Sequence, residues 1–136
     1  MAHIEKEIDN GVVNVKAFGA KGDGTTDDTV SIQNAINHLH NNKNKGTLYF
    51  PAGSYIITSE LNVCKNGGYY NIVGDGRRNT SIIAGAEMES MLKLGKDNST
   101  HAIYRISDIR INLSTHALIG IDARYVNYST VENCYF

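Results

Sequence analysis

The segment Ile106-Ser107-Asp108-Ile109-Arg110-Ile111 can be laid over the later segment Val131-Glu132-Asn133-Cys134-Tyr135-Phe136. Apolar residues match at the first, fourth and sixth places, and Asp108 matches Asn133 at the third. In both segments the alternation of apolar and polar residues changes phase at this third place. Because Asp and Asn adopt the left-handed backbone conformation more readily than other non-glycine residues, we expect a turn between two strands there.

The spacing of the two segments is typical of one coil of a parallel β-helix, in which three short strands and three turns form a rung. One coil cannot bury its inner face alone, so neighbouring coils must stack. We predict an all-β fold, a single-stranded right-handed parallel β-helix, with rungs of about 21–25 residues that start near Gly46, Gly67, Glu89 and Leu113. A β-sandwich is the alternative, but no two-residue Asn-Gly or Asp-Gly loop joins two clean alternating runs.

Only one segment has the period of a helix. Ile32, Ala35, Ile36 and Leu39 form one apolar stripe at helical spacing, which predicts a helix near residues 27–40. Thr25 or Thr26 is expected to cap it, and Asp27 and Asp28 complement its positive end. We predict that the apolar stripe packs on the first rung and closes the solenoid.

The remaining pattern is one of short strands. Residues 13–18 alternate as a half-buried strand, expected to lie beside the first rung. Residues 19–24 break this strand with three glycines. Further strands are predicted at residues 47–50, 54–58, 70–73, 81–84, 91–94, 103–106, 109–113, 118–121 and 129–136.

The composition limits the partners. The chain has 13 basic and 14 acidic residues, so it lacks the basic excess that favours nucleic acid or an anionic membrane. No apolar run approaches the about 18 residues that span a bilayer. Residues 1–8 lack the layout of a secretory signal. Cys64 and Cys134 fit neither a metal motif nor a disulfide framework, and we expect two buried thiols.

Three motifs in order give the chain a family resemblance. They are VNVKAFGAKGDGTTDDT at residues 13–29 followed by IQNAI at 32–36, GTLYFPAGSY at 46–55, and IVGDG at 72–76 followed by TSII at 80–83. This order closely resembles the opening of the pectate-lyase-like superfamily, which includes rhamnogalacturonases, polygalacturonases, epimerase-like lyases and phage tailspikes. The resemblance implies residues 1–45 as a strand, Gly-rich loop and capping helix, and residues 46–136 as the first four or so rungs.

The resemblance also implies a polysaccharide or cell-surface glycan as partner. The leading hypothesis is part of a phage or prophage tailspike, with a homotrimer as the candidate assembly, that binds and degrades a host surface polysaccharide. The absent signal favours a virion over a secreted protein. The alternatives are a secreted polysaccharide lyase or glycoside hydrolase, and a noncatalytic structural or capping module. Because family members generally place catalytic residues on later rungs, we expect a truncated segment that is inactive alone.

Site candidates are few. Glycan cleavage commonly uses two carboxylates, and Asp122 is the candidate catalytic acid. Arg124, Tyr125 and Asn127 follow it and are candidate substrate-binding residues, since aromatic faces stack on sugars and planar polar groups bind hydroxyls. Asp108 is explained by its turn instead.

The Gly-rich segment 19–25 is not a phosphate loop, because Thr25 stands where the Walker pattern needs lysine. Asp23, Asp27 and Asp28 leave a calcium site open as a lesser alternative. Otherwise no cofactor or metal is expected. His38 and His40 are two apart on the predicted helix and face different ways, so they do not form a chelating pair.

Overall fold

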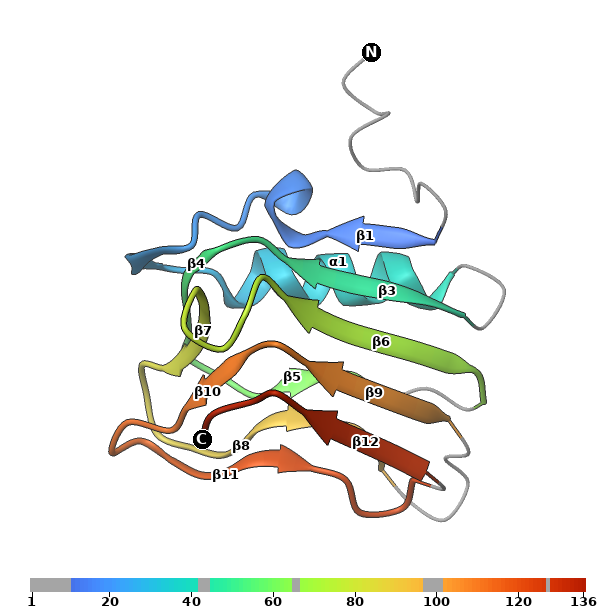
Figure 1. Ribbon diagram of the computed structural model, residues 1–136. Helices are drawn as coiled ribbons and strands as arrows, with labels where there is room; N and C mark the ends of the chain where they lie inside the picture. Colours follow the sequence, from blue (N-terminus) through green and yellow to red (C-terminus); the bar gives the residue numbers. More distant parts are fainter. Residues whose placement is uncertain (1–10, 42–44, 65–66, 97–101, 127) are drawn as a thin grey trace.

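Three parallel sheets run along the molecule, and the chain visits each in turn (Figure 1). The computed structural model describes residues 11–41, 45–64, 67–96, 102–126 and 128–136. All strand pairs in these residues are parallel. The fold is therefore the predicted parallel β-helix, and the sandwich alternative is excluded.

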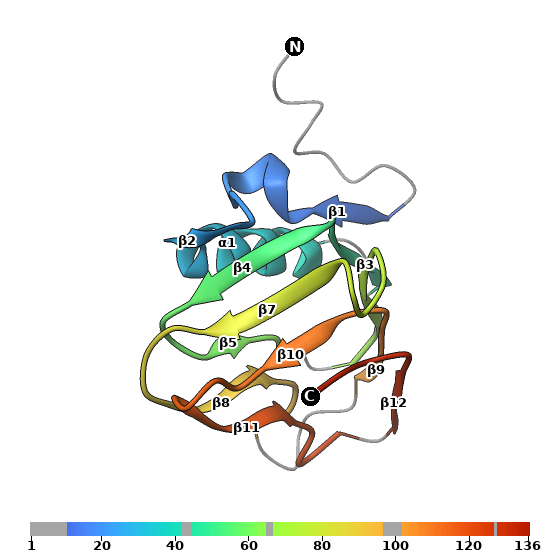
Figure 2. The same ribbon diagram turned by 60° about the vertical axis from the view of Figure 1, so that its left-hand side comes forward.

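Each of the three complete coils contributes one strand to each sheet. The five-stranded sheet, at the front of Figure 1, contains in order β1 (Val12–Asn14), β3 (Lys45–Phe50), β6 (Tyr69–Gly74), β9 (Ile103–Ser107) and β12 (Tyr128–Glu132). The four-stranded sheet, prominent in Figure 2, contains β10 (Arg110–Asn112), β7 (Thr80–Ala84), β4 (Gly53–Ile57) and β2 (Asp23–Asp27). The three-stranded sheet contains β11 (Ala117–Asp122), β8 (Met88–Lys93) and β5 (Leu61–Asn62). Strands β1, β2 and β12 extend two of the sheets at their ends.

The coils differ in length more than the sequence suggested. Register along the five-stranded sheet aligns Lys45 with Tyr69, Tyr69 with Ile103, and Ile103 with Tyr128, so the middle coil is clearly the longest of the three. The predicted rung starts near Glu89 and Leu113 are therefore wrong. They lie within β8 and between β10 and β11, respectively. Connections outside the sheets can lengthen without disturbing strand pairing, so a nearly fixed period was the wrong assumption.

The predicted corner between strands is confirmed. Asp108 and Asn133 both have left-handed backbone, with φ of 61° and 52°. The strands that lead into them pair in the predicted register, Ile106 with Val131. The strand predicted at residues 129–136 is too long, because β12 ends at Glu132 and the chain turns at this corner before Tyr135 bridges to Arg110.

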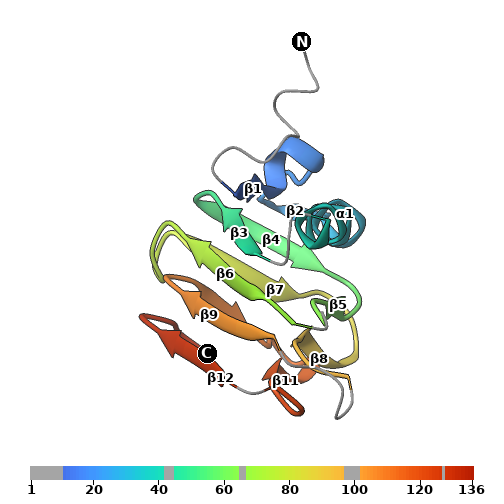
Figure 3. The same ribbon diagram turned by 90° about the vertical axis from the view of Figure 1, so that its right-hand side faces the viewer.

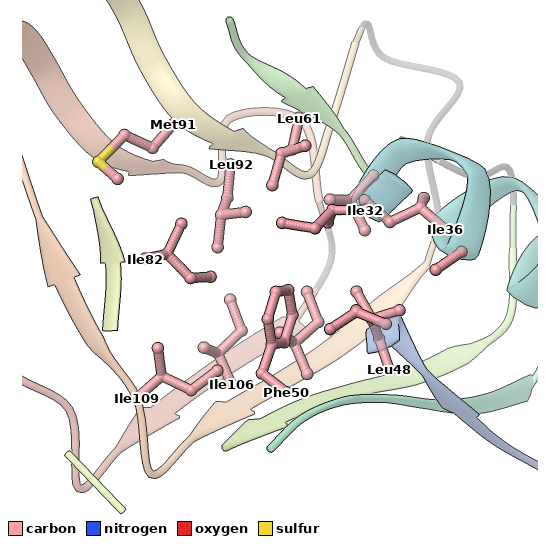
Figure 4. Close-up of a cluster of buried hydrophobic side chains, with 14 of the residues drawn as sticks. Ile32, Ile36, Leu48, Phe50, Leu61, Ile82, Met91, Leu92, Ile106 and Ile109 are labelled. Atoms are coloured by element: carbon pink, nitrogen blue, oxygen red, sulfur yellow. The ribbon is translucent and has the colours of Figure 1, made fainter. Parts of the chain in front are cut away.

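The core consists of inward side chains that stack from coil to coil. One such column aligns Leu48, Ile72 and Ile106, each at most 1% exposed. Columns from the other sheets meet it in the interior, where Phe50, Leu92 and Ile82 approach one another (Figure 4). Burial of one such side chain contributes about 1.5–3 kcal/mol, so stacking is the main source of stability. Further columns include Tyr55, Ile82 and Ile111, and Leu61, Leu92 and Ile121.

The strand predicted at residues 13–18 lies beside the first rung, as expected, but is shorter. β1 pairs with β3 and ends at Asn14, where the 3-10 helix η2 (Val15–Phe18) begins. The Asn14 side chain accepts a hydrogen bond from the Lys16 amide at 2.9 Å, which turns the backbone out of the strand. Residues 23–27, expected as loop and helix cap, form β2 because they pair with β4.

The helix α1 (Thr29–His40) lies across the end of the first coil, and Figure 3 views it nearly end-on. Ile32, Ile36 and Leu39 are fully buried, and α1 packs on β3 and β5, which confirms the predicted cap. The cap residue is Asp28 rather than Thr25 or Thr26. The Asp28 carboxylate binds the Gly-rich loop instead, accepting from the Lys21 and Gly22 amides at 2.8 and 3.0 Å.

A side chain of α1 also covers the free edge of β5. The Gln33 amide nitrogen donates to the Asn62 carbonyl at 3.0 Å, and the Gln33 amide oxygen accepts from the Asn62 backbone nitrogen at 2.9 Å. This pair of bonds has the donor and acceptor pattern of a neighbouring strand. An open sheet edge pairs readily with other chains, and Gln33 satisfies the edge of β5 on which no strand of the described residues lies.

We predict that Ile36→Asp destabilises the protein by several kcal/mol, because it places an unpaired charge at a fully buried position. Urea unfolding followed by circular dichroism measures the loss. The matched control is Val30→Asp on the same helix, where the side chain is 72% exposed and the expected change is within about 0.5 kcal/mol. Equal losses for the two variants would contradict the capping role of the buried stripe.

Gln33→Ala should leave the backbone amide and carbonyl of Asn62, at the edge of β5, without their hydrogen bonds to Gln33. We expect a net loss of about 1–3 kcal/mol from the two bonds and faster hydrogen exchange at the Asn62 amide, measured by NMR. Asn37→Ala is the control, since it removes only the contact from the Gln33 amide nitrogen to the Asn37 side-chain oxygen. Unchanged exchange at Asn62 in Gln33→Ala would show that Gln33 does not protect the edge.

Candidate functional site

The candidate acid Asp122 is the last residue of β11 and is only 4% exposed. Both of its oxygens are engaged by Arg124. Oδ1 accepts from the Arg124 backbone nitrogen at 3.1 Å and from Nε at 2.9 Å, while Oδ2 accepts from Nη2 at 2.6 Å. This bidentate pair with a backbone anchor fixes the turn after β11 and the guanidinium with it.

The electrostatics of the pair follow from these bonds. The Arg124 side-chain hydrogen bonds hold the pKa of Asp122 below its usual value, against the opposing effect of burial. The same bonds, with the Asp122 charge, raise the pKa of Arg124. Asp122 is therefore a carboxylate at neutral pH, whereas a general acid must carry a proton there.

Strand β8 adds two further charges near the turn, one through strand register and one through an ion pair. Lys93 of β8 lies opposite Asp122 of β11. Glu89, also in β8, is an exposed carboxylate, and its Oε1 lies 3.4 Å from Arg124 Nη2. We call Glu89, Lys93, Asp122 and Arg124 the β8–β11 charge cluster. Its arginine is 61% exposed, so the guanidinium is held by carboxylates while remaining accessible.

Tyr125 follows in the same turn. It has left-handed backbone with φ of 66°, and its side chain is 52% exposed beside Arg124. The turn packs closely on the neighbouring coil, because a Cβ on Gly95 would collide with the Arg124 carbonyl oxygen. Only glycine fits there without displacing the turn. Asn127, the remaining substrate-binding candidate, lies outside the described residues.

The arrangement favours binding more than acid–base chemistry. Arg124 presents a fixed and accessible guanidinium, which suits a carboxylate or other anion. An ionised, buried Asp122 fits a positioning role for Arg124. Its catalytic role stays a prediction, as do the binding roles of Arg124, Tyr125 and Asn127.

The three aspartates of the calcium alternative do not converge. Asp23 accepts from the Thr25 and Thr26 amides, Asp27 binds Thr29 and Thr58, and Asp28 holds the Gly-rich loop. Among the residues that the structure describes, no group of three or more His, Cys, Asp or Glu side chains could hold a metal ion. The carboxylate oxygens that calcium would need as ligands therefore accept hydrogen bonds within the fold.

The cysteines and helix histidines have structural surroundings. Cys64 and Cys134 are free and half-buried rather than buried as expected, and burial raises the pKa of both thiols. They are therefore largely protonated and weakly nucleophilic at neutral pH. His38 contacts the Phe18 ring and His40 the Tyr70 ring, so they face different ways as predicted. Within the described ranges no helix is long and apolar enough to cross a membrane.

Sequence reasoning found the β11 turn but missed Glu89 and Lys93. The two strands pair with Met88 opposite Ala117, which is a longer offset than any coil the sequence indicated. Because the sequence indicated rungs of about 21–25 residues, it did not predict that β8 and β11 pair in this register. The Tyr49 contact with Asp75, at 2.7 Å, was also missed, because it too joins side chains of neighbouring coils.

The fold places this chain in the class of parallel β-helix proteins with a helical cap. The charged turn lies at one edge of its three-stranded sheet. Residues 12–134 match the family described as rhamnogalacturonase A/epimerase, pectate lyase-like. The chain therefore belongs to this family, as its opening motifs implied. The family contains lyase-like and epimerase-like proteins that act on polysaccharides.

Comparisons with individual proteins are consistent with this family assignment. The chain is 33% identical over 129 residues to alginate lyase 7 of Azotobacter vinelandii, covering 88% of this chain and 15% of the relative. Its fold matches ORF18 of Geobacillus virus E2 with a TM-score of 0.78 and 29% identity, covering 92% of this chain and 25% of that one. It matches the A-module of mannuronan C-5 epimerase AlgE4 of Azotobacter vinelandii with a TM-score of 0.66 and 26% identity, covering 89% and 37%.

Asp122→Asn should show how the contribution of the Asp122–Arg124 ion pair to the unfolding free energy depends on pH. The folded pKa lies below the unfolded value of about 3.9, so the ionised pair stabilises the protein above that pH. This contribution is lost as pH falls through the folded pKa. We expect the difference in unfolding free energy between the wild type and Asp122→Asn to be largest near neutrality and to shrink below about pH 4.

Urea unfolding at several pH values measures this difference. The control is Asp108→Asn, a corner where Asn133 already shows that asparagine is accepted. A difference for Asp122→Asn that stays constant with pH would exclude the ion pair as its source.

Proposed function

We propose that this chain is a β-helix segment of a tailspike-type phage protein that binds and degrades a surface polysaccharide. The observation that carries the proposal is the likeness to a viral protein over 92% of the chain, within a family related to alginate lyase and mannuronan epimerases. The location on a virion and assembly as a homotrimer are parts of the same proposal. Sedimentation of the whole protein tests the trimer.

The β8–β11 charge cluster supports an acidic polysaccharide as the ligand. A uronate carboxylate can accept charge-assisted hydrogen bonds from Arg124, and Lys93 adds positive charge beside it. Tyr125, exposed in the same turn, offers an aromatic face for the sugar ring. In this proposal Asp122 positions Arg124, and Glu89 competes with the ligand for the guanidinium.

A secreted alginate lyase-like or epimerase-like enzyme is the second candidate. The 33% identity to alginate lyase 7 over 129 residues favours it. Both candidates predict binding of uronate polymers, so they differ in location and assembly rather than in the ligand of this turn. A noncatalytic capping module, the third reading, predicts no polysaccharide binding.

Arg124→Gln should weaken binding of mannuronan about tenfold or more at low salt, because a charge-assisted hydrogen bond is worth about 1.5–3 kcal/mol. Affinity electrophoresis and calorimetry with mannuronan and a neutral glucan measure this. Arg78→Gln, an exposed arginine on another turn, is the matched control. Equal binding by wild type and Arg124→Gln would reject the role of the cluster, and no binding by the wild type would favour the capping module.

The isolated 136-residue chain is expected to be catalytically silent, since its acid candidate is ionised and held by Arg124. Loss of acid–base assistance typically costs about 10²–10⁴-fold in rate. Release of reducing ends and absorbance of unsaturated sugars, measured over acidic and neutral polysaccharides, test this. Robust turnover that disappears in Asp122→Asn would contradict it and assign catalysis to Asp122.

A further inference from the structure

The outer face of the five-stranded sheet carries two large aromatic side chains with no role in the core. Tyr69 of β6 and Tyr128 of β12 are 66% and 72% exposed. The core is supplied by other residues of the same sheet, such as Tyr70 and Tyr104, which are fully or almost fully buried. In Figure 1 no helix or strand of the described residues crosses in front of this sheet.

The two tyrosines lie in one column across the strands. Tyr69 pairs with Ile103, and Ile103 pairs with Tyr128, so all three side chains leave the same face at the same register. Parallel strands are about 4.8 Å apart, which places the two tyrosines about 9.6 Å from each other along the solenoid axis. We call Tyr69, Ile103 and Tyr128 the tyrosine column.

A second, polar column lies beside it. Asn71, Arg105 and Thr130 are in register with one another, two residues further along the same three strands. This places them about 6.6 Å from the tyrosine column, at the rise of two strand residues. Asn71 and Thr130 are exposed groups that can bind hydroxyls. Arg105 is paired with Glu132, through Nε at 2.6 Å, so its charge is compensated while its side chain stays 61% exposed.

We propose that this face is a second polysaccharide-binding surface, on which an extended chain lies along the solenoid axis with sugar rings stacked on Tyr69 and Tyr128. The inference rests on the proposed function for the class of ligand. The separation of the tyrosines is close to the length of a disaccharide unit in an extended, equatorially linked polymer. The apolar face of a sugar ring matches the electron-rich face of tyrosine, while its hydroxyls reach the polar column.

The physics of this surface differs from that of the β8–β11 charge cluster. Between Tyr69 and Tyr128 the arginine is paired with Glu132, so stacking and neutral hydrogen bonds are expected to provide the binding there. Salt weakens exposed charge interactions and leaves apolar contacts largely intact. Binding to the tyrosine column is therefore expected to persist at high salt, whereas binding through Arg124 is lost there.

The test measures binding of mannuronan and of a neutral glucan at low and high salt by calorimetry. We expect salt-resistant binding of at least one of these polymers that falls at least tenfold in the double variant Tyr69→Thr, Tyr128→Thr. Threonine keeps a high strand propensity, so the sheet should survive, and circular dichroism checks this. Tyr69→Phe should bind like the wild type because the ring remains. Tyr135→Thr, at an exposed tyrosine outside the column, is the matched control.

Nitration of tyrosines mapped by mass spectrometry gives an independent measurement. The same polymers should protect Tyr69 and Tyr128 and leave Tyr135 reactive. Protection that rises with protein concentration in the absence of glycan would overturn the inference and identify the face as a contact between copies.

The two proposals fail separately. If the double variant binds like the wild type while Arg124→Gln loses binding at low salt, the glycan lies only at the charge cluster. The second surface is then rejected and the proposed function stands. Absence of salt-resistant binding to both polymers likewise rejects the tyrosine column. If salt-resistant binding depends on Tyr69 and Tyr128 but Arg124→Gln has no effect, the column is supported and the role of the cluster is rejected.

Discussion

Burial of each coil's inner face by the next coil is the interaction on which the whole structure depends. Columns such as Leu48, Ile72 and Ile106 place one apolar side chain from each coil at the same register, so removing a coil exposes its neighbours. The parallel register follows, because a slip by one residue would turn every inward side chain outward. The corner residues Asp108 and Asn133 preserve this register by reorienting the chain within a single residue.

Within the described residues, no complete coil precedes the first coil to cover its apolar side chains and to pair with its backbone groups. Helix α1 does both. Its apolar stripe covers the inner columns, and Ile36 is fully buried there. Its polar groups replace missing strand partners. Gln33 provides both bonds to Asn62, and Thr29 Oγ1 accepts from the Thr58 amide at 2.8 Å. A helix thus satisfies backbone groups that a preceding coil would otherwise pair with.

The same stacking explains where chemistry can be placed. Outward side chains at equal register form columns along the solenoid, so a few residues from distant parts of the chain produce an extended surface. The β8–β11 charge cluster and the tyrosine column are two such surfaces, on different sheets and of different character. One presents Arg124 held by carboxylates, and the other presents exposed tyrosine rings beside a neutralised arginine.

Much of this architecture was predictable from local pattern. The stripe at Ile32, Ile36 and Leu39 predicted the helix and its buried face, and alternation predicted most strands within a few residues. The match of Asp108 with Asn133 predicted both the corner and its left-handed backbone. These features depend on periodicity and on intrinsic backbone preferences, which a sequence carries residue by residue. The motifs near residues 13–83 also indicated the family.

What the tertiary structure alone decided is which residues meet across coils. The sequence predicts a loop at residues 23–27 because these exposed residues have no apolar alternation, and only pairing with β4 makes them the strand β2. Gln33 has no sequence signal as an edge partner of Asn62. The pairing of Lys93 with Asp122 and the alignment of Tyr69 with Tyr128 depend on coils of unequal length. Connections vary in length at little energetic cost. The sequence therefore determined the helix and most of the strands, while the register between packed coils determined which side chains meet in the two candidate surfaces.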